Sequence, residues 1–258
     1  MVLGMAVVVL LLGSFFYAFI ISQRKKLKYQ QDMQQLRETQ QNQLIEAAVR
    51  SEEIERHRIA EILHDEVGAI LSSSKLHIQG IKLATLDTRD QGLFAKGKEL
   101  LDDGIQKVRG ISHNLHSNIL KEFGLNDAIR HFINQTVDST MIKTATKLDE
   151  AYTTVNADKD ISIYRMIQEL VNNILKHSQA DELTITSVYE NNHLMITIFH
   201  TGKGIDQQQF EALRYKKDGL GLKNIMNRII LLKGSIDFFS DDRGYYVKIN
   251  APINKEMV

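Results

Sequence analysis

The chain has 258 residues, with 32 lysines and arginines against 32 acids, and it contains no cysteine. The balanced charge gives no electrostatic reason to expect direct binding to nucleic acid. The missing thiols exclude disulfides, thiolate metal sites and cysteine catalysis. The nine histidines are scattered, and only His113 and His116 lie close at helical spacing, so they do not indicate a metal site.

Residues 2–21 form an uncharged apolar segment, and the basic residues Arg24, Lys25, Lys26 and Lys28 follow it. About 20 apolar residues in a helix can cross a hydrocarbon core of about 30 Å. A cleaved signal peptide would instead need a basic start and a small-residue cleavage site, which the segment lacks. We therefore expect a single transmembrane helix with its N-terminus outside, surrounded by membrane lipid, and the rest of the chain in the cytoplasm.

From Gln23 to Ile81 the sequence is typical of a long helix, because apolar residues recur every three or four positions. Over residues 23–54 this spacing predicts a coiled-coil linker. The apolar seam weakens between Leu36 and Leu44, which makes that section a candidate hinge for passing on a helix rotation.

A turn is expected at Ala84–Gly92, followed by a second helix whose apolar residues again share one face. Two antiparallel helices cannot bury both apolar seams alone, whereas two copies of the hairpin can do so as a four-helix bundle. We therefore predict a homodimer built on a helical domain over residues 55–121.

The remaining domain, residues 122–255, alternates short strand patterns with helical ones. Hairpin signals at Glu190–Asn192 and Asp241–Gly244 favour an α+β sheet covered on one face. The predicted helices cover 125–137, 159–177 and 222–233. The predicted strands are Lys143–Leu148, Leu183–Tyr189, Leu194–Phe199, Ile236–Phe239 and Tyr245–Ile249.

Four polar residues share one face of the helix predicted over 159–177, because they stand at i, i+4, i+7 and i+8. They are Glu169, Asn173, Lys176 and His177. Such a face suits a magnesium-bound triphosphate, since an amide oxygen can ligate Mg²⁺ and an ammonium can neutralise phosphate. An ordinary solvated helix face would carry similar residues, so this spacing leaves both interpretations open.

Two glycine-containing motifs follow this helix. Gly202-Lys203-Gly204 comes after a predicted strand, and Gly219-Leu220-Gly221-Leu222 leads into a helix. Glycines allow the backbone to approach a ligand, and a helix N-terminus favours anions. Each motif alone is weak, and their order after the Asn173 helix is the specific feature.

Four sequence motifs, in order, resemble bacterial two-component sensor histidine kinases. ERHRIAEILHDEVG resembles the phosphoacceptor box of the nitrate-sensor and lipid-fluidity-sensor subfamily, and SHNLHSNILKEFGLNDAI resembles the end of its second dimerisation helix. QELVNNILKH and the stretch from GKGID to GLGLKNIMNRI resemble the ATP-binding domain shared with gyrase and a heat-shock chaperone family. The resemblance implies a dimeric four-helix bundle and an α/β (α+β) sandwich that binds ATP, and these follow the transmembrane helix expected from the apolar segment.

The resemblance also implies the roles of individual residues. His64 would accept phosphate, with Asp65 as the orienting acid and general base, although helix geometry alone favours Glu61 as the neighbour of His64. Asn173 would hold Mg²⁺, with Glu169 activating or orienting beside it. The other nucleotide-binding residues would be Lys176, His177, His200, Gly202, Gly204, Gly219, Leu220, Gly221 and Leu222, with a lid between Asp206 and Asp218. Apart from the resemblance, a glycine inside a helix costs about 1 kcal/mol relative to alanine, and we hypothesise that Gly68, one turn beyond His64, clears space for an incoming phosphate donor or acceptor.

Two positions depart from the family pattern. His200 stands where the family usually has an aspartate that accepts a hydrogen bond from the adenine amino group, and a neutral imidazole has only one acceptor nitrogen. Ala69 stands where subfamily members often have a glutamine that positions water, so we expect weak phosphatase activity towards the regulator.

The leading hypothesis is therefore a dimeric histidine kinase in the bacterial cytoplasmic membrane. It would phosphorylate His64 from ATP and pass the phosphoryl group to an aspartate of a response regulator, by resemblance one with a helix-turn-helix output domain. A membrane or cytoplasmic sensory partner would supply input. The alternatives are a degenerate ATP-binding membrane scaffold, which His200 favours, and an ATPase of the same superfamily doing mechanical work, which the phosphoacceptor-type helix disfavours.

Overall fold

The computed structural model describes residues 2–81, 87–115, 118–137, 141–216 and 219–253, without the side chains of residues 2–13, 18 and 137. The chain divides into two units, Met1–Ala47 and Ala48–Val258. Helix α1, Val2–Ile62, provides all the described residues of the first unit and begins the second. Within the part of the chain that the structure describes, no helix reaches the length and hydropathy needed to cross a membrane. The transmembrane helix over 2–21 therefore stays a prediction.

The second unit starts with a helical hairpin. The end of α1 runs through a π-helical turn, η1 (Leu63–Val67), into α2 (Gly68–Gln79), and α3 (Thr88–Leu115) returns alongside. The buried Ser112 hydroxyl on α3 donates to the Ala60 carbonyl at 3.0 Å, which sets the register of the two arms. The predicted turn at Ala84–Gly92 is too long, because α3 already begins at Thr88 and the Asp87 carboxylate accepts from the Asp90 N–H at 2.7 Å.

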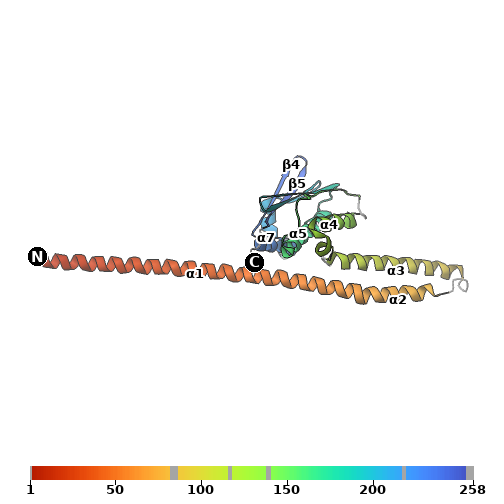
Figure 1. Ribbon diagram of the computed structural model, residues 1–258, viewed down its shortest axis with the longest axis horizontal. Helices are drawn as coiled ribbons and strands as arrows, with labels where there is room; N and C mark the ends of the chain where they lie inside the picture. The colour runs from red at the N-terminus through yellow and green to blue at the C-terminus, as the bar shows by residue number, and fades with distance from the viewer. Residues whose placement is uncertain (1, 82–86, 116–117, 138–140, 217–218, 254–258) are drawn as a thin grey trace. The chain divides into compact units, whose positions relative to one another are not determined.

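The rest of the second unit is a sheet with helices on one face. The helices are α4 (Asn118–Val137), α5 (Ala157–His177), α6 (Gln207–Leu213) and α7 (Leu220–Leu232). The strands are β1 (Lys143–Lys147), β2 (Glu182–Glu190), β3 (His193–His200), β4 (Ser235–Asp241) and β5 (Gly244–Pro252). Their order is β1-β2-β3-β5-β4, and only β1 and β2 run parallel. Figure 1 shows α5 and α7 together beside this sheet.

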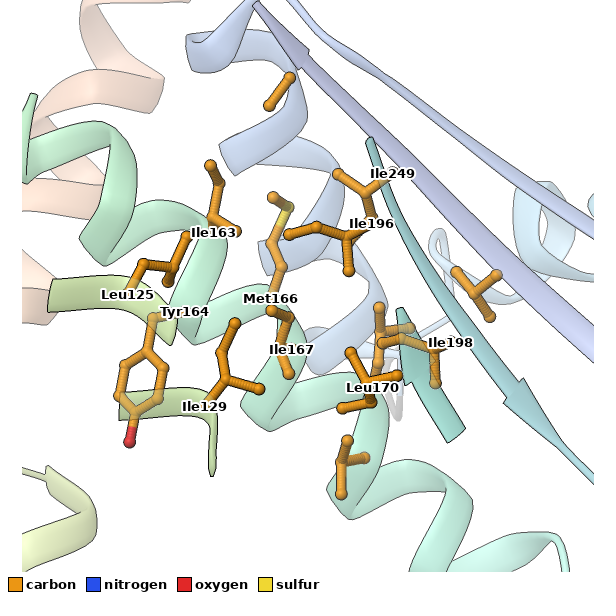
Figure 2. Packing of buried hydrophobic residues seen from close by; sticks show 14 of the residues in the cluster. Leu125, Ile129, Ile163, Tyr164, Met166, Ile167, Leu170, Ile196, Ile198 and Ile249 are labelled. Atoms are coloured by element: carbon orange, nitrogen blue, oxygen red, sulfur yellow. The ribbon is translucent and has the colours of Figure 1, made fainter. Parts of the chain in front are cut away.

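The core forms between the inward face of the sheet and the apolar stripes of α4, α5 and α7. Alternate residues of β3 point inward, so that Leu194, Ile196 and Ile198 are buried and meet Ile163, Ile167 and Leu170 of α5. Figure 2 shows Met166 and Ile167 between Ile129 of α4 and the strand residues Ile196 and Ile249. This packing holds α5 firmly, and its polar flank is thereby placed at the edge of the core.

The predicted strands and helices of this domain are confirmed, with longer bounds for most of them. The β2–β3 hairpin turns through Asn191 and Asn192, both in the left-handed region (φ 52° and 61°), as a two-residue turn requires. Helix α4 changes direction at Gly124, whose backbone is not helical (φ 83°). Helix α6 was not predicted, and it lies within the segment expected to form the lid.

Candidate functional site

His64 lies in the π-helical turn with its side chain largely in solvent. Its exposed fraction is 68%, and its Nδ1 lies 2.9 Å from Oδ1 of Asp65, itself 75% exposed. A carboxylate can only accept, so Nδ1 carries the shared proton and Nε2 keeps the lone pair in the neutral ring. The turn thus presents a histidine whose outer nitrogen is a free nucleophile.

The pairing of His64 with its immediate neighbour follows from the local helix geometry. Neighbouring side chains of a regular α-helix diverge by about 100° and do not face each other. A π turn closes i→i+5 hydrogen bonds, here from the Gly68 N–H to the Leu63 carbonyl, and it rotates less per residue. The expectation that Glu61 lies closer to His64 is therefore wrong, and Glu61 instead lies 3.9 Å from His57.

Gly68 ends the π turn in ordinary helical conformation. A Cβ built there would meet only the Leu63 carbonyl oxygen, at 3.4 Å, which is normal van der Waals contact. The packing of the chain itself therefore does not require glycine at this position, and its role in admitting a second molecule stays a hypothesis.

A cavity of about 600 Å³ opens between α5, α7 and the end of the sheet. Most of the predicted nucleotide-binding residues line it: Glu169, Asn173, His177, His200, Gly204, Gly219, Gly221 and Leu222. Lys176 and Leu220 are exposed and lie outside its lining, as does Gly202. The structure therefore brings eight of the predicted residues to one cavity and leaves three of them outside its lining.

Glu169 and Asn173 form the polar wall of the cavity, one helical turn apart on α5. The Asn173 amide nitrogen donates to Oε1 of Glu169 at 3.3 Å, which leaves the amide oxygen free to accept or to ligate. Gly221 makes room for this pair, because a Cβ at that position would overlap the Glu169 carboxylate. The glycine in α7 and the acid on α5 are thus parts of one arrangement.

The predicted glycines Gly202, Gly204 and Gly219 also lie so close to neighbouring groups that an added Cβ would overlap them. A Cβ on Gly204 would overlap the Tyr245 ring, and one on Gly219 would overlap the Leu213 carbonyl oxygen. Gly202 has φ 84°, which favours glycine, and its neighbour Lys203 donates from N–H to the Ser178 carbonyl at 2.7 Å. Gly202 therefore shapes the loop behind the cavity wall although it does not line the cavity.

His200 is the last residue of β3 and continues its inward-facing set, so its ring is 3% exposed and lines the cavity. Its Nδ1 lies 2.7 Å from the Thr201 carbonyl oxygen, which can only accept. Nδ1 is therefore protonated, and Nε2 is the acceptor in the neutral ring. Burial lowers the pKa of His200 below its usual value, against the smaller opposing effect of the Thr201 hydrogen bond, and this favours the neutral form.

Sequence reasoning missed several residues of this site. Lys203 and Lys216 line the cavity and add positive charge, and Tyr245 stacks on His200 with 5.6 Å between ring centroids. Helix α6 is fixed by a capping box, in which Oδ1 of Asp206 accepts from the Gln209 N–H at 2.7 Å. An acid followed three residues later by glutamine is a helix-start signal that could have revealed α6.

Two family models match the chain, in the order of the two modules described above. One, described as histidine kinase, covers residues 55–120, and the other, described as histidine kinase-, DNA gyrase B- and HSP90-like ATPase, covers residues 158–255. The first includes the π turn with His64, and the second includes all residues that line the cavity.

Two curated sensor proteins are similar to the chain. The sensor histidine kinase MctS of Rhizobium johnstonii is 26% identical over 222 residues, which are 83% of this chain and 48% of MctS. The sensor protein VraS of Staphylococcus epidermidis is 24% identical over 208 residues, 79% of this chain and 57% of VraS. The chain spans about half the length of the curated relatives it matches.

Among solved structures, the blue-light activated histidine kinase of Erythrobacter litoralis EL346 is similar with a TM-score of 0.47 and 16% identity, over 74% of this chain and 60% of that one. The family assignment rests on the two models and the curated relatives. With a phosphoacceptor-type helical module followed by an ATPase module, the chain belongs to the sensor histidine kinases of two-component systems.

Proposed function

We propose that this chain is an ATP-dependent protein histidine kinase that phosphorylates His64 and passes the phosphoryl group to an aspartate of a separate response regulator. The observation that carries the proposal is the 2.9 Å contact between Nδ1 of His64 and Oδ1 of Asp65 on an exposed turn. It leaves Nε2 as the attacking atom and puts a carboxylate beside the ring that will gain charge.

The proposed transfer balances as follows. The Nε2 lone pair of His64 forms a bond to the γ-phosphorus while the bond from that phosphorus to the β,γ-bridging oxygen breaks, and ADP leaves with that electron pair. The ring then carries a positive charge, and its Nδ1 proton is shared with or taken by the Asp65 carboxylate. Positioning and charge neutralisation provide most of the catalysis in such a transfer.

The cavity fits the nucleotide and its metal ion. The free amide oxygen of Asn173 is a suitable ligand for Mg²⁺, which commonly binds one or two protein oxygens together with substrate phosphates. When bound, Mg²⁺ would neutralise charge on the phosphates. Lys203 and Lys216 would add to that neutralisation, and the N-terminus of α7, which has no side-chain cap, favours an anion. His200 would accept a hydrogen bond from an amino group of the base.

The proposal also includes a homodimer and attachment to a membrane. Large apolar side chains on the hairpin are exposed in the single chain, among them Ile70 at 65%, Leu76 at 69% and Leu100 at 60%, which supports a four-helix bundle with a second copy. The uncharged residues 2–21, followed by basic residues, support a single-pass anchor in the cytoplasmic membrane. Light scattering of the purified protein tests the dimer, and membrane fractionation of cells expressing it tests the anchor.

Incubation of the protein with Mg²⁺ and ATP labelled on the γ-phosphate tests the kinase. We expect label on the protein that is lost in acid and kept in base, and its transfer to a cognate regulator. A degenerate scaffold would instead bind ATP and take up no label.

The pH dependence of nucleotide binding tests His200, the residue that favours the scaffold alternative. The neutral ring accepts through Nε2, and its lowered pKa keeps it neutral at pH 7. As the pH falls through that lowered pKa the ring gains a proton on Nε2 and stops accepting, so ATP affinity should fall about tenfold for each further pH unit. Calorimetric titrations from pH 8 down to the lowest pH at which the protein stays folded measure this.

Two variants separate His200 from other titrating groups. His200→Asn should bind ATP with no pH dependence from this residue, because an amide oxygen accepts a hydrogen bond and does not titrate. His177→Gln, which changes the other histidine of the cavity lining, should keep the pH dependence of the native chain. Equal affinity of the native chain and His200→Asn at every pH would mean that the base does not use His200.

A further inference from the structure

His200 has one ring nitrogen that is free for a ligand. Its Nδ1 donates to the Thr201 carbonyl oxygen at 2.7 Å, and its Nε2 has no hydrogen-bond partner among the residues that the structure describes. The residue is 3% exposed and lines the cavity, but Nε2 itself is not fully buried. This nitrogen therefore faces the cavity, and a bound molecule is the partner that it lacks.

Two parts of the cavity lining differ in chemistry. The Asn173 amide on α5 and the uncapped N-terminus of α7 suit Mg²⁺ and phosphate. The part contributed by the sheet is aromatic and apolar, since it contains Phe238, Val247 and the Tyr245 ring, which stacks on His200 at an interplanar angle of 15°. Stacked rings and apolar side chains suit a flat, uncharged base. The base of a nucleotide therefore fits beside His200.

The Thr201 carbonyl oxygen fixes the tautomer of His200. Because a carbonyl oxygen can only accept, the neutral ring keeps its proton on Nδ1 and its lone pair on Nε2. The Tyr245 ring stacks on the imidazole, and Gly204 lies directly against Tyr245, so packing opposes a flip of the imidazole ring. At Nε2, neutral His200 is thus an acceptor only, and protonated His200 is a donor only.

We propose that His200 selects the purine by the group at its C6 position, taking 6-aminopurine triphosphates when the ring is neutral and 6-oxopurine triphosphates when it is protonated. The inference rests on the proposed function, which places a nucleotide in this cavity. The amino group of adenine donates to the lone pair of a neutral Nε2, whereas the C6 oxygen of hypoxanthine or guanine meets that lone pair with one of its own. A proton on Nε2 reverses both interactions.

The surroundings of His200 set how readily its ring gains this proton. Burial lowers the pKa of His200, against the smaller effect of the Thr201 hydrogen bond, so the ring is neutral at pH 7. In the cavity lining, the ammonium groups of Lys203 and Lys216 oppose the imidazolium and the Glu169 carboxylate favours it. The other titratable residues of the lining are His177, Tyr245 and Tyr246, and the described residues of α7 and β4 add none.

The two classes of base should respond to pH in opposite directions. An oxo base bonds only to the protonated ring, so its binding takes up a proton. Its affinity should rise by up to about tenfold for each pH unit as the pH falls from 8, until the pH passes the lowered pKa of free His200. ATP binds the neutral ring, so its affinity should stay constant over that range and fall only below that pKa.

Calorimetric titrations of the purified full chain test this selection. The ligands are the β,γ-methylene analogues of ATP, inosine triphosphate and purine riboside triphosphate, which carry an amino group, an oxygen and a hydrogen at C6. Because all three share the same phosphate chain, its titration cancels in their relative affinities. We expect the affinity ratio of the adenine to the hypoxanthine nucleotide to fall at least about tenfold from pH 8 to pH 6.5. The ratio of the adenine nucleotide to the unsubstituted purine should stay constant over the same range.

Two variants assign the effect to His200. His200→Asn can turn either its oxygen or its amino group to the base and does not titrate, so its affinity ratio should not depend on pH. His193→Gln is the matched control on the same strand, because His193 is exposed, contacts Asn250 at 2.9 Å and lies outside the cavity lining, and it should behave as the native chain.

The possible outcomes separate this selection from the proposed kinase activity. A native ratio that stays constant with pH, or a ratio that still changes in His200→Asn, overturns selection by His200 and leaves the kinase proposal standing. Failure of all three nucleotides to bind overturns both. A ratio that changes as expected, with no label transferred from ATP to the protein, supports the selection and overturns the kinase proposal alone.

Discussion

His64→Gln should remove all acid-labile label from the protein, and Asp65→Asn should slow its appearance by about a hundredfold. The first change removes the attacking nitrogen. The second keeps an oxygen that can accept from Nδ1 but removes the negative charge that stabilises the phosphorylated, positively charged ring, and loss of such a group commonly costs 10²–10⁴ in rate. Initial rates with labelled ATP, followed by acid and base treatment, measure both effects.

Glu61→Gln is the control for this pair. Glu61 lies one turn before His64 and faces His57, so its neutralisation should leave the labelling rate unchanged. The affinity for ATP should be the same in all three variants, because none of these residues lines the cavity. A native rate in Asp65→Asn, or a loss of rate in Glu61→Gln, would show that the acid has been assigned to the wrong residue.

Gly221→Ala should reduce autophosphorylation by about a hundredfold and leave the fold intact. The new methyl group occupies the space of the Glu169 carboxylate, which is the flexible end of a side chain and can swing away. The Asn173 amide then loses its hydrogen-bond partner, and a preorganised group of this kind is commonly worth 10²–10³ in rate. Rate measurements at saturating ATP and thermal unfolding of the same preparations test the two halves of the prediction.

Gly110→Ala provides the matched comparison. Gly110 lies inside α3 and has no neighbour within 4 Å of a built Cβ, so alanine should leave the rate unchanged and stabilise the helix by about 1 kcal/mol. If Gly221→Ala labels as fast as Gly110→Ala, then the position of Glu169 does not matter to the reaction.

The sequence predicted the strands of the ATPase module and the face of α5 that lines the cavity, because alternation and helical spacing are local patterns. It could not predict the contact of His64 with Asp65, since that depends on a π turn inside a helix that otherwise repeats regularly. Spacing and the family resemblance together also assigned Lys176 to the site, whereas that side chain is exposed in the structure and Lys203 and Lys216 line the cavity from loops. Loop positions are set by packing between distant segments, here by Phe210 of α6 on Phe238 of β4.

The contacts of Arg165 with the Glu53 carboxylate and the Leu115 carbonyl could not be predicted from the sequence for a related reason. In sequence Arg165 is a charged residue among the apolar residues of α5, and its partners outside that helix are 50 to 112 residues away. Charge pairs across such separations leave no periodic pattern. The turn before α3 was misplaced because Gly92 weighed more in the sequence than the Asp87 cap that starts the helix there.

The π turn gives the phosphoacceptor helix one residue more than an uninterrupted α-helix would use for the same turn. This extra residue sets the angle between the face of α1 that carries Glu52 and Glu53 and the face of α2 that packs against α3. Conversion of the turn to regular helix would advance everything after it by about 100° relative to the acids. His64 therefore lies in the turn that sets how far α1 is rotated about its own axis relative to the helical hairpin. The residue proposed to accept phosphate is itself part of this π turn.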